Sequence, residues 1–373
     1  MNSAILVLTT SYPTRHGDPS GHFVRSEARD LARSEEVRVI AAGRGQATHS
    51  SDLEFEPRVE WLGGEALFGF PGALTKLRQN PLSVICLGPV LIRAWFAIRK
   101  HRGDIQAHWL FPFGLLAALN LLTRISSSQG PAPRLSVVAH GSDVRLLRRA
   151  PRFIQSLCVS LLLRAKTELV FVSNELRAEL GQGLKGQLKN YVSSAQVRPA
   201  KIEFEAVEPS RERAREVLDE NQGRRLAVVV GRLIPGKRCE IALGALCLVP
   251  ELDVICVGDG PLRAELMARF PEVRFVGQCE RPRALLWIQA ADVLVSASRL
   301  EGAPTTIREA LALGTMAVSV KVADLELWAE SDPNLLVVGA AQPRQELGEV
   351  ARPRADVELR SQYLVRREPN SAG

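Results

Sequence analysis

Aromatic residues are scarce in this sequence: tryptophan, tyrosine and phenylalanine make up only 5% of its 373 residues. Proteins that bind single-stranded nucleic acid stack the bases on aromatic side chains. The net charge of +7 could suit nucleic acid, but the sequence has no aromatic stripe and no recognisable nucleic-acid-binding module. We expect no nucleic-acid partner.

Cys-x-x-Cys pairs are also missing, and the first residues do not resemble a leader segment. The six cysteines form no Cys-x-x-Cys pair and no cluster with histidine, so no zinc site is expected. Most lie within apolar runs, which is typical of free thiols in a reducing compartment. No basic segment followed by a long apolar stretch opens the chain, so we predict no signal peptide. The most apolar window, 82–98, is interrupted by Pro89 and Arg93 and is not expected to span a bilayer. These features predict a cytoplasmic protein.

Short strands rich in valine, isoleucine and leucine alternate with amphipathic helical segments along most of the chain. This alternation predicts an α/β protein with parallel sheets covered on both faces, and the length suits two domains. The predicted divisions are a first domain over 1–185, a linker over 186–221 with some helix near 210–220, a second domain over 222–340, and a tail over 341–373.

The segment 299–314 joins a short apolar strand to a predicted helix and carries two carboxylates, Glu301 and Glu309. The first N–H groups of a helix lack intrahelical partners and its dipole favours negative charge, so the backbone of 302–306 could hold a diphosphate. A carboxylate can accept hydrogen bonds from two adjacent sugar hydroxyls. The spacing of Thr306 and Glu309 also fits a capping box, in which Glu309 would only close its own helix. The spacing alone leaves both interpretations open.

The same segment resembles the Glu-x7-Glu motif of the retaining GT-B glycosyltransferases, a family typified by bacterial mannosyl- and glucosyltransferases. The resemblance extends to 228–237, where Arg232 and Lys237 stand at the positions that hold the donor diphosphate in that family. Arginine offers a forked donor set to phosphate oxygens and lysine a mobile charge. Segments 252–260 and 274–277 match the next strands of the family in order and spacing. The resemblance implies a GT-B fold, with two Rossmann-like parallel-sheet domains facing a cleft.

The first half of the chain resembles the family more faintly. The loop 11–21, with Gly17 and Gly21, corresponds to the glycine loop that reaches toward both substrates. His140 lies in a His-Gly-x-Asp segment with Asp143. An imidazole there can hydrogen-bond the transferring sugar and help stabilise positive charge on its ring. A histidine at a strand end can equally make a structural hydrogen bond, and His108, in a second histidine segment, is a weaker candidate.

The resemblance implies transfer of a sugar from a nucleotide-diphosphate donor to a glycan or lipid-linked acceptor in polysaccharide biosynthesis, with retention at the anomeric carbon. The predicted catalytic residues are His140, Glu301, Arg232 and Lys237. The predicted substrate-binding residues are Gly17, Gly21, Asp143, Gly302, Ala303, Pro304, Thr305 and Glu309. No metal and no cofactor beyond the nucleotide sugar as co-substrate are implied, because cationic side chains and helix-end N–H groups neutralise the diphosphate.

Basic residues flank two apolar helical stretches, 84–98 and 153–163. They are Arg93, Arg99, Lys100 and Arg102 for the first, and Arg145, Arg148, Arg149, Arg152 and Arg164 for the second. Such faces could rest on anionic lipid, at about 1 kcal/mol per well-placed cation. They could also be solvated faces over buried helices. The first interpretation predicts peripheral contact with the inner face of a membrane.

Two other functions remain open. One is a nucleotide-sugar epimerase on the same fold, which would need additional carboxylates in the cleft. The other is a non-catalytic GT-B partner or scaffold subunit. Three departures from the family pattern favour it: the sequence of 201–209 after the domain crossover, the replacement of a glycine-rich turn by 321–326, and the short tail over 341–373 that normally packs back toward the first domain.

Overall fold

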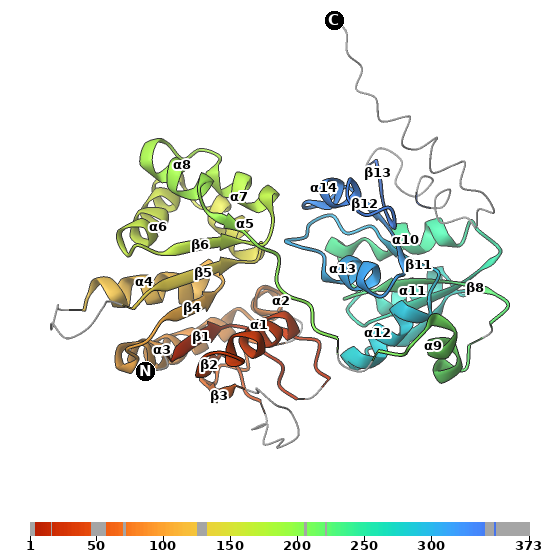
Figure 1. Ribbon diagram of the computed structural model, residues 1–373, viewed down its shortest axis with the longest axis horizontal. Helices are drawn as coiled ribbons and strands as arrows, with labels where there is room; N and C mark the ends of the chain where they lie inside the picture. Colours follow the sequence, from red (N-terminus) through yellow and green to blue (C-terminus); the bar gives the residue numbers. More distant parts are fainter. Residues whose placement is uncertain are drawn as a thin grey trace, which may run out of the picture.

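The computed structural model describes residues 4–339 and Leu347, with the exception of 16, 46–56, 70–71, 125–132, 205–206 and 221. Two α/β domains lie side by side and the chain crosses between them after β7 (Figure 1). The two-domain α/β prediction is confirmed, and each domain is built on its own parallel sheet.

The first domain contains a seven-stranded sheet in the order β3-β2-β1-β4-β5-β6-β7, and all its neighbouring strands pair in parallel. Its strands are β1 (Ile5–Thr9), β2 (Val37–Ala41), β3 (Arg58–Trp61), β4 (Ile105–His108), β5 (Leu135–Ala139), β6 (Glu168–Phe171) and β7 (Gln196–Val197). The central strands are buried because helices cover both faces of the sheet, which explains their nearly continuous apolar sequences.

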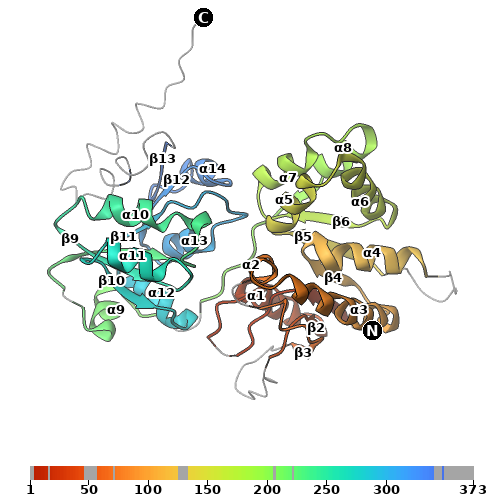
Figure 2. The ribbon, with the colours of Figure 1, turned by 180° about the vertical axis from the view of Figure 1, so that it is seen from behind.

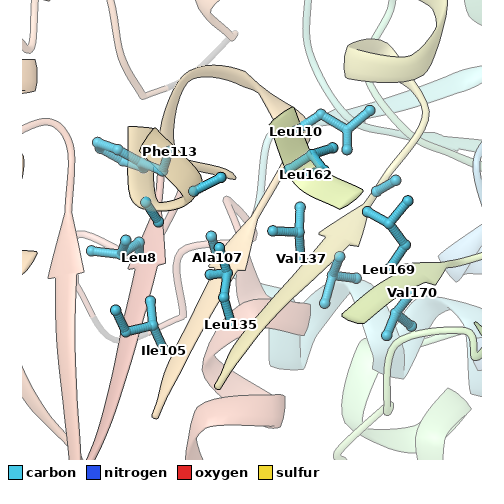
Figure 3. Packing of buried hydrophobic residues seen from close by; sticks show 14 of the residues in the cluster. Leu8, Ile105, Ala107, Leu110, Phe113, Leu135, Val137, Leu162, Leu169 and Val170 are labelled. Atoms are coloured by element: carbon cyan, nitrogen blue, oxygen red, sulfur yellow. The ribbon is translucent and has the colours of Figure 1, made fainter. Parts of the chain in front are cut away.

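The helices of the first domain divide between the two faces of its sheet. They are α1 (His22–Ala32), α2 (Ala73–Gln79), η1 (Pro81–Cys86), α3 (Leu87–Lys100), η2 (Leu110–Gly114), α4 (Leu115–Leu122), α5 (Ser142–Arg149), α6 (Arg152–Arg164), α7 (Asn174–Gly181) and α8 (Gly186–Ser193). Side chains of β1, β4 and β5, such as Leu8, Ala107 and Val137, pack beneath the segment around Phe113 and beneath Leu162 of α6 (Figure 3). This layer is the largest apolar cluster of the domain, and it fixes the carboxyl ends of these strands.

The second domain contains a six-stranded parallel sheet in the order β10-β9-β8-β11-β12-β13. Its strands are β8 (Arg225–Val230), β9 (Leu252–Val257), β10 (Arg274–Gly277), β11 (Val293–Ser296), β12 (Met316–Val320) and β13 (Leu335–Val338). Its helices are α9 (Arg211–Leu218), η3 (Pro235–Lys237), α10 (Cys239–Leu246), α11 (Arg263–Arg269), α12 (Arg281–Ala290), α13 (Thr305–Ala312) and α14 (Leu325–Ala329). Apolar clusters cover both faces of this sheet.

The predicted domain boundaries need correction. Strand β7 pairs with β6, so the first domain runs to Val197 rather than to 185. At the other side of the crossover, Arg215 of α9 donates hydrogen bonds to Ala290 O and Asp292, which makes α9 part of the second domain. The linker is therefore 198–210 instead of 186–221. The helix predicted near 210–220 is α9. The mostly polar sequences of α8 and α9 concealed that they belong to the domains, because each buries only a narrow apolar stripe. The predicted tail lies outside the described residues except for Leu347, which packs in the core of the second domain.

One helical stretch in the described part of the chain, Pro81–Lys100, is long and apolar enough to cross a membrane by length and composition alone. It comprises η1 and α3. Val90, Ala94 and Ile98 form one stripe along α3 and are at most 1% exposed, because they pack in the first-domain core. The stretch is thus a covering helix of the sheet, although only 28% of its most apolar window is buried.

Candidate active site

The site forms where the strand order of the second sheet reverses, between β8 and β11. Ligands of open α/β sheets bind outside the carboxyl ends of the strands at such a switch point. The loop after β8 brings Lys237 there, and the loop after β11 brings Glu301. The Lys237 Nζ and Glu301 Oε1 atoms lie 2.5 Å apart. Two predicted catalytic residues that are far apart in sequence therefore meet, and each neutralises the other.

Arg232 lies in the same loop as Lys237 and is exposed. A Cβ built on Gly231, the residue before it, would lie 4.0 Å from Lys237 Cε. The guanidinium Nη1 of Arg232 lies 3.6 Å from a Cβ built on Gly72 of the first domain. The loop after β8 thus presents both predicted phosphate-binding cations, and Arg232 extends toward the other domain.

The corner 301–303 of the second domain touches the His140 loop of the first. Arg145 donates a hydrogen bond from Nη2 to Glu301 O at 2.7 Å. A Cβ on Gly302 would lie 2.1 Å from the carbonyl oxygen of His140, so only glycine fits between the two backbones. Ala303 packs against the core of the first domain. The two domains are therefore closed on one another at this point.

The helix of the Glu-x7-Glu segment, α13, begins at Thr305 with Pro304 as its N-cap residue, and no side chain caps it. Glu309 instead accepts a hydrogen bond from Arg281 Nη2 at 2.8 Å. The capping-box interpretation is therefore wrong. Burial raises the pKa of Glu309, while Arg281 acts in the opposite direction. Glu309 is a buried carboxylate held by a buried guanidinium from the start of α12, with both side chains about a tenth exposed or less.

The two predicted histidines contact one another. His108 Nδ1 and His140 Nε2 lie 2.9 Å apart and the rings are stacked. Burial lowers the pKa of His108 to about 3 and the pKa of His140 well below its ordinary value, so both imidazoles are neutral near pH 7. His140 also packs against the rings of Phe23 and Trp109. The pair belongs to the first-domain side of the cleft.

Asp143 does not face the cleft, which corrects its predicted role as a substrate-binding residue. Its side chain is 3% exposed. One carboxylate oxygen accepts from Leu110 N, and the other accepts from Gly141 N and Val144 N. Asp143 therefore ties the loop that carries His140 to the segment after β4.

The glycine loop lies between the domains. Gly17 O accepts a hydrogen bond from Arg281 N at 2.8 Å, which joins the loop to the first residue of α12. Gly21 has a φ of 65°, and a Cβ there would lie 2.2 Å from Ser11 O. A narrow cavity of about 20 Å³ beside this loop is lined by residues that include His22 and Arg281. It is large enough for about one water.

A larger hollow of about 550 Å³ lies at the crossover, where Lys201 and Glu203 meet α1 and Arg308. It is an open groove lined mainly by charged side chains, several of which form ion pairs between the crossover and α1. Lys237, Glu301 and His140 do not line it. We place the site at the switch point because the predicted residues converge there.

Several residues at the site carry no motif that sequence reasoning could use. Arg145 and Arg281 bind Glu301 and Glu309 across the fold. Asp324 accepts hydrogen bonds from Asn174 N, at 2.7 Å, and from Glu175 N. The segment 321–326, which departs from the family pattern, thus holds the second domain to the first residues of α7.

Comparisons with known proteins agree with this architecture. Residues 224–356 match the family model described as "Glycosyl transferases group 1". Among solved structures, sucrose-phosphate synthase from Thermosynechococcus elongatus is similar over 93% of this chain and 88% of that chain, with a TM-score of 0.66 and 17% identity. Anabaena Alr3699/HepE in complex with UDP-glucose gives the same coverage and identity with a TM-score of 0.64. The chain has the GT-B fold.

A curated relative gives the sequence match. The putative teichuronic acid biosynthesis glycosyltransferase TuaC of Bacillus subtilis (strain 168) is 28% identical over 239 residues, which are 62% of this chain. The match spans 57% of the length of that relative. With the family model over 224–356, these findings show that the chain is similar to group 1 glycosyltransferases, most directly in its second domain.

Proposed function

We propose that this protein transfers a sugar from a nucleotide-diphosphate donor to a glycan or lipid-linked acceptor in polysaccharide biosynthesis, with retention at the anomeric carbon. The observation that carries the proposal is the meeting of Lys237 and Glu301 at the switch point of the second sheet, against the His140 loop of the first domain. An ammonium suited to phosphate and a carboxylate suited to sugar hydroxyls meet there, and the backbone of the His140 loop lies beside the Glu301 corner.

The family match and one solved complex support the choice of donor. The domain that carries Lys237 and Glu301 is the one matched by the group 1 family model. Anabaena Alr3699/HepE, which has the same fold, has been crystallised with UDP-glucose. A nucleotide-diphosphate sugar is therefore the donor class that we propose for this chain.

The proposed reaction requires no protein nucleophile. The bond between the anomeric carbon and the diphosphate oxygen breaks while the acceptor oxygen bonds to the same face of that carbon. The acceptor's proton passes to the departing diphosphate. Arg232, Lys237 and the free N–H groups near the start of α13 stabilise the growing negative charge, so the proposal includes no metal and no further cofactor.

The remaining side chains would hold the donor. When Lys237 turns to the diphosphate, Glu301 would lose its contact with Lys237 and accept hydrogen bonds from the hexose hydroxyls. Glu309 would bind the ribose. His140, which is neutral, would hydrogen-bond the transferring ring. Both carboxylates are already held by cations in the closed protein, so donor binding replaces contacts rather than desolvating bare charges.

The alternatives make different demands. An epimerase would need further carboxylates in the cleft, and Asp143 is unavailable because backbone N–H groups bind it. The hypothesis of a scaffold subunit rests in part on the departures from the family pattern at 201–209 and 321–326. In the structure Lys201 and Glu203 pair with side chains of α1, and Asp324 binds the first residues of α7. One departure therefore holds the linker to the first domain, and the other holds the second domain to the first.

Thermal unfolding in the presence of nucleotide sugars separates these classes. We expect one member of a panel of UDP-, GDP-, ADP- and TDP-sugars to raise the melting temperature, because only the folded site binds it. Incubation of that donor, labelled in its sugar, with candidate acceptors then identifies the product. If no nucleotide sugar raises the melting temperature, the result would support a scaffold. If a donor raises the melting temperature and is converted to its isomer, the result would support an epimerase.

Glu309→Gln is expected to weaken donor binding about tenfold, because a charged hydrogen-bond acceptor for hydroxyl groups is lost. Titration calorimetry with the donor found above measures this. The matched control is Glu326→Gln. Glu326 is an exposed carboxylate of α14 that pairs with Lys321, and its substitution should leave the dissociation constant unchanged. Equal affinity in both variants would remove Glu309 from the donor site.

A further inference from the structure

Three adjacent helices of the first domain present apolar side chains to solvent. Helix α3 packs on α4, and α4 packs on α6, so their outer surfaces form one continuous side of the domain. The exposed side chains are Leu82 and Ile85 of η1, Ile92 and Phe96 of α3, Leu119 and Leu122 of α4, and Phe153 and Leu157 of α6. We call this set the apolar face. Large contiguous apolar surfaces on soluble domains mark interaction sites.

The spacing shows that the apolar face is separate from the core. On α3 the inward stripe is Val90, Ala94 and Ile98, while Ile92 and Phe96 lie on the opposite side of the helix. Phe153, which is 72% exposed, is the second residue of α6. Both sides of these helices are thus apolar, although packing uses only one.

The charge around the apolar face has one sign. Between Ala66 and Thr167 the sequence contains fourteen lysines and arginines but only two acidic residues, Asp104 and Asp143. Asp104 pairs with Arg134, and Asp143 is buried. Elsewhere in the chain acidic residues outnumber basic ones. Exposed cations at the ends of α3, α5 and α6 include Lys100, Arg149 and Arg152.

We propose that the apolar face docks on an anionic membrane surface. Its side chains would enter the region between headgroups and acyl chains while the surrounding cations bind the lipid phosphates. A neutral protein partner would not account for the near absence of acidic residues. Helices α3, α4 and α6 lie on the side of the first domain away from the second domain in both views, so the contact leaves the cleft open (Figures 1 and 2). A lipid-linked acceptor would then be within reach, and this consequence alone rests on the proposed function.

Co-sedimentation with vesicles tests the docking without any glycosyl transfer. We expect binding to vesicles of equimolar phosphatidylcholine and phosphatidylglycerol, weaker binding to phosphatidylcholine alone, and weakening by salt. Phe153→Gln with Leu157→Gln should reduce partitioning about tenfold. Arg149→Glu with Arg152→Glu should reduce it about twentyfold or more, since each cation near an anionic surface contributes about fivefold.

The control is Met267→Gln with Leu327→Gln, two apolar side chains of the second domain that are 45% and 52% exposed, and this variant should bind vesicles like the unchanged protein. All these positions are exposed, and unchanged melting temperatures would show intact folding. Equal binding to both kinds of vesicle, or no loss in the first-domain variants, overturns the proposal. If the unchanged protein is a dimer, and Phe153→Gln with Leu157→Gln dissociates it without changing vesicle binding, the apolar face binds a second copy of the chain instead.

A different observation carries a second inference, which concerns the histidine pair. Glu27 of α1, 3% exposed, accepts hydrogen bonds from Arg198 Nη2 at 2.7 Å and from Gln106 Nε2 at 2.8 Å. The same amide nitrogen of Gln106 lies 3.3 Å from His108 Nε2. Glu27, Gln106 and His108 therefore form a buried chain that ends at the His140 ring.

The chain has one consistent set of proton positions. A carboxylate only accepts, so the Gln106 amide must direct its nitrogen toward Glu27. An amide nitrogen only donates, so His108 Nε2 must accept and the proton of neutral His108 lies on Nδ1. That proton is donated to His140 Nε2, which leaves the proton of His140 on its own Nδ1.

We infer that Glu27 and Gln106 are positioning residues that set the tautomer of His140. Neither would touch substrate. Their effect on transfer rests on the proposed function, because it acts through the hydrogen bond that His140 makes to the transferring sugar. The tautomer itself does not depend on that function.

Nitrogen-15 spectra of histidine-labelled protein test the tautomer. The His140 signals, identified by their loss in His140→Gln, should show a protonated Nδ1 and an unprotonated Nε2, and should not titrate between about pH 8 and pH 5. Glu27→Gln should produce a mixture of tautomers, and Gln106→Leu should do the same if Glu27→Gln fails to fold. If transfer is found, kcat should fall about tenfold with little change in the donor KM.

Asp30→Asn is the matched control, since Asp30 is a surface carboxylate on the same helix that pairs with Lys201. It should change neither the spectrum nor kcat. A proton on His140 Nε2 in the unchanged protein, or an identical spectrum in both Glu27→Gln and Gln106→Leu, overturns the inference. An altered spectrum with no transferase activity in any protein would instead reject the proposed function.

Discussion

Lys237→Ala is expected to reduce kcat by about a hundredfold to a thousandfold, the range found when one preorganised donor to a developing negative charge is removed. The lysine Nζ is held 2.5 Å from Glu301 at the mouth of the site, so little reorganisation separates it from the departing diphosphate. Because its contribution grows as the bond breaks, kcat should fall more than donor affinity does. Steady-state kinetics with the donor found by thermal shift measures both.

The fold should tolerate this change. The Lys237 and Glu301 side chains are 24% and 16% exposed, so water can solvate the glutamate that loses its partner. Lys321→Ala removes another lysine of the second domain from an exposed pair with Glu326, and it controls for loss of charge. Equal kcat in the two variants, with both proteins folded, would remove Lys237 from the leaving-group site.

Gly302→Ala is expected to reduce kcat/KM by about a hundredfold while each domain stays folded. The added Cβ would lie 2.1 Å from the carbonyl oxygen of His140, and backbone on both sides cannot yield. The domains would have to part there, and a displacement of about 1 Å at a reacting centre can cost about a hundredfold in rate. Small-angle scattering should show a more open molecule, and kinetics should show the loss.

Gly236→Ala is the matched control for this change. Gly236 lies in η3, next to Lys237, and a Cβ built there meets nothing within 4 Å. Its activity and scattering should match those of the unchanged protein. If Gly302→Ala also retains full activity, the closed contact between Gly302 and His140 is not used in catalysis.

Local patterns were sufficient to predict most of the fold. The apolar runs at β8, β9 and β11, each followed by a glycine turn or a short loop and then a helix, predicted the second parallel sheet. The predictions that were wrong concern the edges of the domains. The short strand β7 and the helices α8 and α9 bury narrow stripes, so their sequences look like a linker although their partners lie in the sheets.

The site was predictable only in part. Arg232, Lys237 and Glu301 were chosen because their loops match a known family, and the structure brings Lys237 and Glu301 together. The roles of these residues stay predictions. Asp143 was chosen as a substrate ligand from its place in the His-Gly-x-Asp segment, but three backbone N–H groups bind it. No sequence pattern marks a carboxylate as turned inward.

The sequence by itself determined the alternation of strands and helices, the loops that carry the charged side chains and the large excess of basic residues between 66 and 167. These properties depend on residues close together in the chain. Only the tertiary structure decided that Arg281 holds Glu309, that Asp324 binds the start of α7, and that Glu27 is connected through Gln106 to the histidine pair. Each of these contacts joins residues from 28 to 150 positions apart, whose meeting depends on how strands order themselves in a sheet and how the two domains close.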